Sequence, residues 1–127
     1  MTLRPGQTVP FFEVSDTAGA RVAYRDIWQR RPLVLIRLPG DGPEWRAYAA
    51  ATASRAPDLS AHGAALVLTT DPVPGLPSAG AVVADRWGEI HEVTTAATPA
   101  EMPGADVLVE WLRFVQHQCP ECQGEAR

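Results

Sequence analysis

The chain contains no lysine, and all eleven of its basic residues are arginines. These arginines form no cluster, and the formal net charge of −4 argues against a nucleic-acid-binding surface. No apolar run approaches the ~20 residues that a membrane helix needs, and residues 1–14 lack the apolar segment of a signal peptide. We therefore expect a cytoplasmic protein that binds neither nucleic acid nor a membrane.

Cysteine is also scarce. The two cysteines, Cys119 and Cys122, lie three positions apart as CPEC, so they cannot join distant elements by a disulfide. The 127 residues, 46% of them apolar, are the right size for one domain with a substantial core. We predict a single domain over residues 1–127 that carries a C-terminal CPEC tail at about 119–127.

One stretch, PLVLIRLPGDGPEW at 32–45, organises the predicted fold. Its continuous apolar run at 33–36 is typical of a central strand that is buried on both faces. A turn follows, and Pro43 suits the first position of a helix, where Glu44 favours the positive end of the helix dipole. Exposed N–H groups at such a helix start can stabilise an anion or a thiolate. The stretch is therefore a candidate active site, although an ordinary strand-to-helix turn explains the same residues.

The remaining pattern predicts a mixed α/β sheet with antiparallel edges and flanking helices. An N-terminal β-hairpin precedes the central strand, Pro57 should kink or end the first helix, and Gly63 should terminate the short helical turn that follows. The further elements expected are a buried strand at 64–69, a loop at 71–80, strands at 81–83 and 90–94, a loop at 96–103 and a final helix at 104–118.

These segments together resemble the thioredoxin-like superfamily. Within it they are similar to the redoxin branch that is related to alkyl hydroperoxide reductase and thiol-specific antioxidant peroxiredoxins. The resemblance covers nearly the whole chain. It is carried by Pro5-Gly6, Pro10, Phe12, Asp16 and Gly19, by the strands LVLIRL and AALVLTTD, by the hairpin VVADRWGEI, and by the ending WLRFVQ..CPEC. It implies a thioredoxin-like fold.

The resemblance also implies a site that lacks its usual sulfur. The family's Cys-x-x-Cys falls on Gly42-Pro43-Glu44-Trp45, and no cysteine precedes Cys119. The family's cis-proline, counted eight residues back from Gly88, falls on Gly80, with Pro77 close by. A degenerate binding site at Arg37, Asp41, Gly42, Pro43, Glu44, Trp45 and Gly80 is therefore expected, with no cofactor.

Three alternatives remain for the Cys119 and Cys122 pair: an inert or reversibly oxidised tail, a redox centre, or part of a metal site to which His117 adds a third ligand. The pair follows a helix C-terminus and encloses Glu121, so the local charge disfavours a reactive thiolate. A dimer could supply four sulfur ligands to one metal ion.

Several other side chains have ordinary structural explanations. Arg37 could bind an anion at the turn, but pairing with Asp41 is the simpler account. The four tryptophans are expected to pack in the core, although Trp45 could instead line a ligand pocket at the turn. We interpret Asp85 as a turn residue and expect His91 to be exposed.

Three functions are compatible with these observations. The favoured hypothesis is a non-catalytic binding or assembly module, whose protein or small-molecule partner the sequence does not identify. The first alternative is a thiol-disulfide oxidoreductase or antioxidant, peroxiredoxin-like enzyme that uses Cys119 and Cys122. The second is a metal-linked homodimer joined through the CPEC tails.

Overall fold

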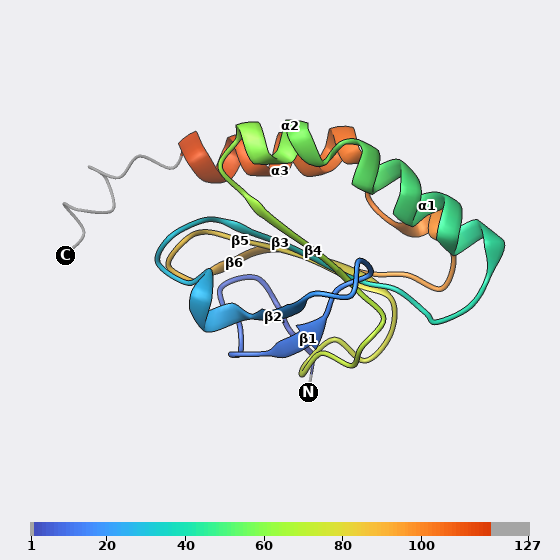
Figure 1. The fold of residues 1–127 in the computed structure, drawn as a ribbon. Helices are drawn as coiled ribbons and strands as arrows, with labels where there is room; N and C mark the ends of the chain where they lie inside the picture. The colour runs from blue at the N-terminus through green and yellow to red at the C-terminus, as the bar shows by residue number, and fades with distance from the viewer. Residues whose placement is uncertain (1, 118–127) are drawn as a thin grey trace, which may run out of the picture.

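The structure, a computed structural model, describes residues 2–117 and contains the predicted elements in the predicted order (Figure 1). The boundaries of these elements differ from the expected ones by a few residues at most. The elements are β1 Glu13–Ser15, β2 Arg21–Ala23, the 3₁₀ turn η1 Tyr24–Asp26, β3 Leu33–Arg37, α1 Pro43–Ser54, α2 Ala56–Ala61, β4 Ala65–Thr69, β5 Gly80–Ala84, β6 Ile90–Thr95, the 3₁₀ turn η2 Pro99–Glu101 and α3 Ala105–His117.

Strand β3 is central, as its apolar run predicted. The four-stranded sheet has the order β4-β3-β5-β6, in which β3 and β4 are parallel and the other two pairs are antiparallel. Helices α1 and α2 connect the parallel pair, since a parallel connection needs a crossover. The β1–β2 hairpin forms a separate two-stranded sheet. The mixed sheet with flanking helices and an N-terminal hairpin is thus confirmed.

The sheet separates two apolar clusters. The three α-helices lie on one face of it and the β1–β2 hairpin lies on the other (Figure 1). Because successive strand residues point to opposite faces, Leu33 and Leu35 pack with the hairpin side, whereas Val34 and Ile36 pack with the helices. A strand buried on both sides has to be apolar throughout, which explains the continuous run at 33–36.

The first helical segment breaks where the sequence predicted. Helix α1 ends at Ser54, and α2 begins at Ala56 with Pro57 in its first turn, because proline supplies no N–H to continue the ladder of α1. The segment ends at Gly63, whose φ of +77° suits glycine. The face of α1 that contacts the helix-side cluster includes Trp45, Tyr48 and Ala49.

None of the helices in residues 2–117 has both the length and the apolar character required to span a membrane.

Candidate functional site

The turn between β3 and α1 lies at the carboxyl edge of the parallel strand pair, as predicted. The amide of Leu38 donates to the Thr69 carbonyl, which keeps the β3 and β4 ends together before the chain turns into α1. Gly42 is the N-cap residue and has a φ of +116°, a backbone conformation that side chains with a Cβ rarely adopt. A Cβ on Gly42 would also lie 3.4 Å from Cδ1 of Trp45. The backbone at this position therefore specifically favours glycine.

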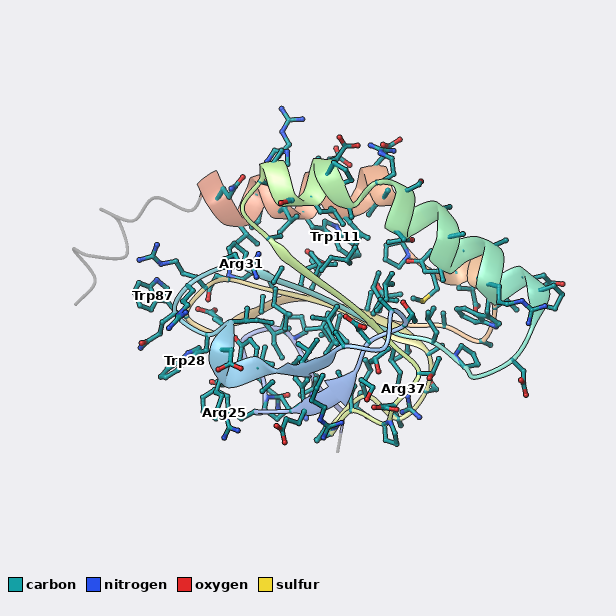
Figure 2. All side chains as sticks on the ribbon, in the orientation of Figure 1. Arg25, Trp28, Arg31, Arg37, Trp87 and Trp111 are labelled. Atoms are coloured by element: carbon teal, nitrogen blue, oxygen red, sulfur yellow. The ribbon has the colours of Figure 1, made fainter. Side chains whose placement is uncertain are left out.

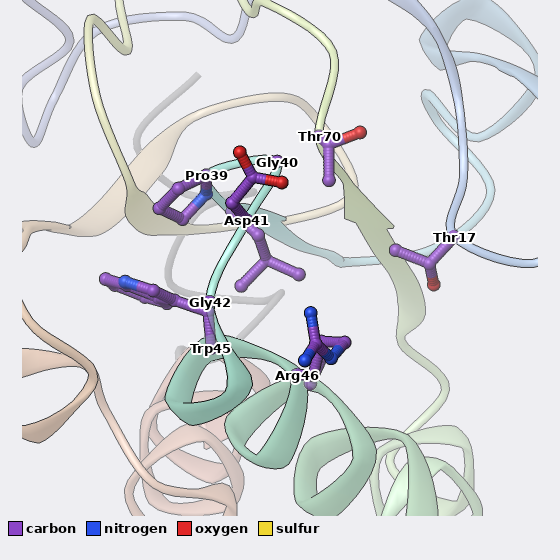
Figure 3. A pocket seen from close by; sticks show the side chains of 10 residues that line it. Thr17, Pro39, Gly40, Asp41, Gly42, Trp45, Arg46 and Thr70 are labelled. Carbon is purple, nitrogen blue, oxygen red and sulfur yellow. The ribbon is translucent and has the colours of Figure 1, made fainter.

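A pocket of about 320 Å³ lies beside this turn (Figure 3). It is formed by the turn after β3, by the first two turns of α1, by the β1–β2 connection and by the residue that follows β4. Trp45 is only half-buried, so it forms one wall and does not close the turn. The lining residues are Thr17, Leu38, Pro39, Gly40, Asp41, Gly42, Trp45, Arg46, Ala49 and Thr70.

The pocket combines an apolar wall with a few polar groups. Leu38, Pro39, Trp45 and Ala49 supply the apolar surface, and none of the lining residues is a cysteine. No side chain caps the N-terminus of α1, so the partial positive charge of the helix start is not offset by a cap there. Arg46 joins none of the ion pairs formed within residues 2–117. Both features favour a negatively charged ligand group.

Not every residue expected at the site lines the pocket. Asp41, Gly42 and Trp45 do, whereas Pro43 and Glu44 are exposed in the first turn of α1 outside the lining. Sequence reasoning missed Arg46, although it follows Trp45 directly and lies within the first turns of the predicted helix.

Arg37 lies on the other side of the sheet. Because alternate strand residues point to the same face of the sheet, Arg37 lies on the same face as Leu33 and Leu35. Its guanidinium donates a hydrogen bond to the Leu76 carbonyl in the loop at 70–79. The expected pairing with Asp41 is wrong, because β3 directs Arg37 away from the face on which α1 begins. Arg37 instead ties the loop between β4 and β5 to the central strand.

Gly80 begins β5 and pairs with both Arg37 and Thr95 at the same end of the sheet as the pocket. It does not line the pocket. A Cβ at this position would lie 2.3 Å from the Thr94 carbonyl oxygen, so the neighbouring strand leaves no room for a side chain. All peptide bonds within residues 2–117 are trans. Gly80 therefore has a packing role at this edge of the sheet.

The CPEC motif, with Cys119 and Cys122, lies outside the described residues, as does the side chain of His117. Helix α3 ends at the opposite end of the helix layer from the start of α1 (Figure 1). The last described residue before the cysteines is consequently far from the pocket.

A second group of polar side chains gathers at the β5–β6 hairpin. Asp85 is a turn residue, as predicted, since its Oδ1 accepts the amides of Trp87 and Glu89. The prediction that His91 is exposed is wrong, because its side chain is only 8% exposed and its Nε2 lies 3.1 Å from Oδ2 of Asp85. A shift of register between β5 and β6 leaves His91 unpaired in the ladder.

The tryptophans differ from one another in burial. Trp28 and Trp111 pack against the two apolar clusters, but Trp87 is 48% exposed, so its expected place in the core is wrong. Trp87 lies at the tip of the hairpin, where its carbonyl accepts a hydrogen bond from the indole N–H of Trp28. The guanidinium of Arg86 lies over the Trp87 ring, 4.7 Å from its centroid. Figure 2 shows Trp28 and Trp87 at one end of the molecule and Arg37 at the other.

Comparison with solved structures shows that the fold is similar to that of peroxiredoxins. The chain is similar to the reduced 2-Cys peroxiredoxin of Plasmodium vivax, with a TM-score of 0.70 and 11% identity over 89% of this chain and 82% of that one. It is similar to AhpC of Mycobacterium tuberculosis, with a TM-score of 0.69 and 12% identity over 95% and 98% of the two chains.

Peroxidoxin BcpB of Mycobacterium tuberculosis gives a TM-score of 0.66 and 15% identity over 92% of this chain and 99% of that one. No protein-family model matches the sequence, and neither does any curated protein. The chain thus has a thioredoxin-like, peroxiredoxin-related fold, as the resemblance in its sequence implied. Identities this low establish the fold and leave the activity to be argued from the site.

Proposed function

We propose that this protein is a non-catalytic binding module, built on a peroxiredoxin-like fold, whose pocket at the start of α1 binds a small carboxylate with an apolar body. The observation that carries the proposal is the pocket itself. It occupies the strand-to-helix turn where the related fold would place its thiols, and its lining offers an apolar wall, Arg46 and an uncapped helix start in place of sulfur.

The arrangement of these groups supports a carboxylate ligand. Arg46 stands on α1 with Thr17 on one side and Trp45 on the other (Figure 3). A carboxylate can accept charge-assisted hydrogen bonds from a guanidinium and from helix N–H groups together. The Trp45 ring would pack on the apolar part of the ligand. Asp41, which also lines the pocket, disfavours a ligand that carries a second negative charge.

Benzoate tests the binding site, with neutral benzamide as its matched control. We expect benzoate to shift the amide resonances of Gly40 and Gly42 and the indole resonance of Trp45 in ¹H–¹⁵N spectra, and benzamide to shift them less. Arg46→Gln should weaken benzoate binding about five- to tenfold, because one charged hydrogen bond is lost. Arg113→Gln, an exposed arginine on α3, should leave binding unchanged. Shifts that spare the pocket would refute the proposed site.

A thiol-disulfide oxidoreductase or peroxidase that uses Cys119 and Cys122 is the alternative, and the peroxiredoxin-like fold is what favours it. We expect the fully reduced protein to consume hydrogen peroxide with dithiothreitol no faster than the double variant Cys119→Ser/Cys122→Ser. Turnover that depends on these cysteines would overturn the non-catalytic role. Native mass spectrometry of the same two proteins tests the metal-linked dimer, which should appear only with both thiols intact.

A further inference from the structure

Three potential metal-ligand side chains meet at the β5–β6 hairpin, on different elements from those that form the pocket. The ligand atoms offered by Asp85, Glu89 and His91 all lie within 4.8 Å of one another. Two of these side chains are almost fully enclosed, with 9% of Asp85 and 8% of His91 exposed, whereas Glu89 is exposed. The group therefore has two fixed members and one that is accessible from solvent.

The spacing within the group fits a shared cation. Oδ2 of Asp85 and Nε2 of His91 lie 3.1 Å apart. Two atoms bound to one zinc ion at ~2.0–2.1 Å in tetrahedral geometry lie about 3.3 Å apart. A divalent cation could therefore bind between these atoms in place of their hydrogen bond.

The hairpin holds Asp85 in a fixed orientation. Its Oδ1 accepts hydrogen bonds from the amides of Trp87 and Glu89, at 2.9 and 3.0 Å, which leaves Oδ2 directed at His91. Two backbone hydrogen bonds close the same turn: the Asp85 amide donates to the Glu89 carbonyl, and the Gly88 amide donates to the Asp85 carbonyl. Such support for a ligand is typical of metal sites, because it reduces the cost of ordering the ligand on binding. The nearby Arg86 is engaged with the ring of Trp87.

Tyr24 provides an independent observation from another element. It is fully buried, and its hydroxyl is the only buried side-chain polar atom in residues 2–117 that lacks a hydrogen-bond partner. The hydroxyl reaches the hairpin turn, where it lies 3.2 Å from the place that a Cβ on Gly88 would take. Burial, and to a lesser extent the Asp85 carboxylate, raises the pKa of Tyr24. An unpaired buried hydroxyl at the turn that joins Asp85 to Glu89 could bond a cation or its bound water.

We propose that Asp85, Glu89 and His91 bind a divalent transition-metal ion of the zinc class, with the Tyr24 hydroxyl as an additional partner of the ion or of its bound water. One imidazole and two carboxylates suit zinc or manganese, and the two carboxylates balance the charge of the ion. Because Glu89 is exposed, a metal ion could reach the site from solvent on that side. This site is separate from the carboxylate pocket, so either proposal can fail without the other.

Zinc titration of the full chain tests the site. The experiment uses Cys119→Ser/Cys122→Ser as its background, so that the tail thiols cannot bind the metal. Isothermal titration with zinc chloride should show one saturable site per chain. His91→Ala and Glu89→Gln should each weaken binding more than about tenfold, whereas His62→Ala should not, because His62 lies at the end of α2 and bonds Gln116 of α3.

The Tyr24→Phe variant, made in the same cysteine-free background, tests the fourth partner. It should weaken zinc binding severalfold, and Tyr48→Phe should leave the affinity unchanged. Circular dichroism establishes that each variant is folded. Cobalt(II) absorption gives a second measure, since loss of His91 should change the visible bands of the bound ion. The proposal is overturned if the cysteine-free chain binds no zinc, or if His91→Ala and His62→Ala bind it equally well.

Discussion

At the scale of single residues, two tyrosines, Tyr24 fully buried and Tyr48 partly buried, differ in how their hydroxyls are satisfied. The Tyr48 hydroxyl donates to the Pro103 carbonyl at 2.7 Å, which ties α1 to the segment before α3. The Tyr24 hydroxyl has no such partner. A buried polar group without a hydrogen bond is costly, so the two residues should respond in opposite directions to removal of the oxygen atom.

The pair Tyr24→Phe and Tyr48→Phe makes this difference measurable. In a chelator-treated protein, Tyr24→Phe should raise the free energy of unfolding by about 1 kcal/mol, because it removes an unpaired buried hydroxyl. Tyr48→Phe should lower it by about 1 kcal/mol, because it leaves the Pro103 carbonyl without its donor. Urea denaturation of both variants measures the effect. A destabilised Tyr24→Phe would mean that the hydroxyl is already satisfied in the metal-free protein.

The same two residues predict the response to alkaline pH. Burial, and next the Asp85 carboxylate, raise the pKa of Tyr24 to about 12, and burial raises the pKa of Tyr48 against a smaller opposing effect of Thr52. The unfolded chain releases these protons first, from about pH 10, so stability is complete below that pH and falls as the pH rises toward 12. The melting temperature with chelator present should follow this course, and Tyr48→Phe should show a shallower fall.

At the scale of elements, the alternation of strand residues explains both what the sequence predicted and what it missed. The apolar run, the prolines and the glycines were sufficient to place β3, α1, the break at Pro57 and the loop before β5. The same alternation, followed one step further along β3, would have placed Arg37 on the hairpin side. The burial of His91 depends on the irregular register between β5 and β6, which a pattern of period two cannot show.

The start of β5 gives a prediction at this scale. Gly80→Ala would force a methyl group against the Thr94 carbonyl, at 2.3 Å, and would push β6 away from β5. We expect a loss of about 2 kcal/mol or more in the free energy of unfolding. Gly104→Ala is the matched control, because a Cβ there meets no atom within 4 Å. Equal stability of the two variants would show that β6 can move aside without cost.

At the scale of the whole molecule, the pocket, the polar group at the β5–β6 hairpin and the end of α3 lie in different places. The pocket lies at the start of α1, whereas α3 ends at the opposite end of the helix layer (Figure 1). The pocket could be anticipated as a location because the strand and the helix start were both recognisable. Its polar character could not, since Thr17, Arg46 and Thr70 come from three segments that only the folded chain brings together.

This separation predicts that the pocket does not depend on the cysteines. Alkylation of Cys119 and Cys122 with iodoacetamide should leave the affinity for benzoate within about twofold of that of the untreated protein, because α3 leads the chain away from the pocket. Mass spectrometry verifies that both thiols have reacted, and the Gly42 and Trp45 resonances report binding. A large loss of affinity on alkylation would show that the tail contributes to the pocket.

The positive φ of Gly42 finally limits how this fold could be engineered for thiol chemistry. Gly42→Cys, the most direct way to install a nucleophile at the turn, would place a Cβ in a strained backbone conformation and against the Trp45 ring. Glu44→Cys and Trp45→Cys avoid that strain, because both positions lie within α1. A designer seeking to turn this scaffold into a peroxidase would therefore have to begin inside the helix, or reshape the turn before adding the sulfur.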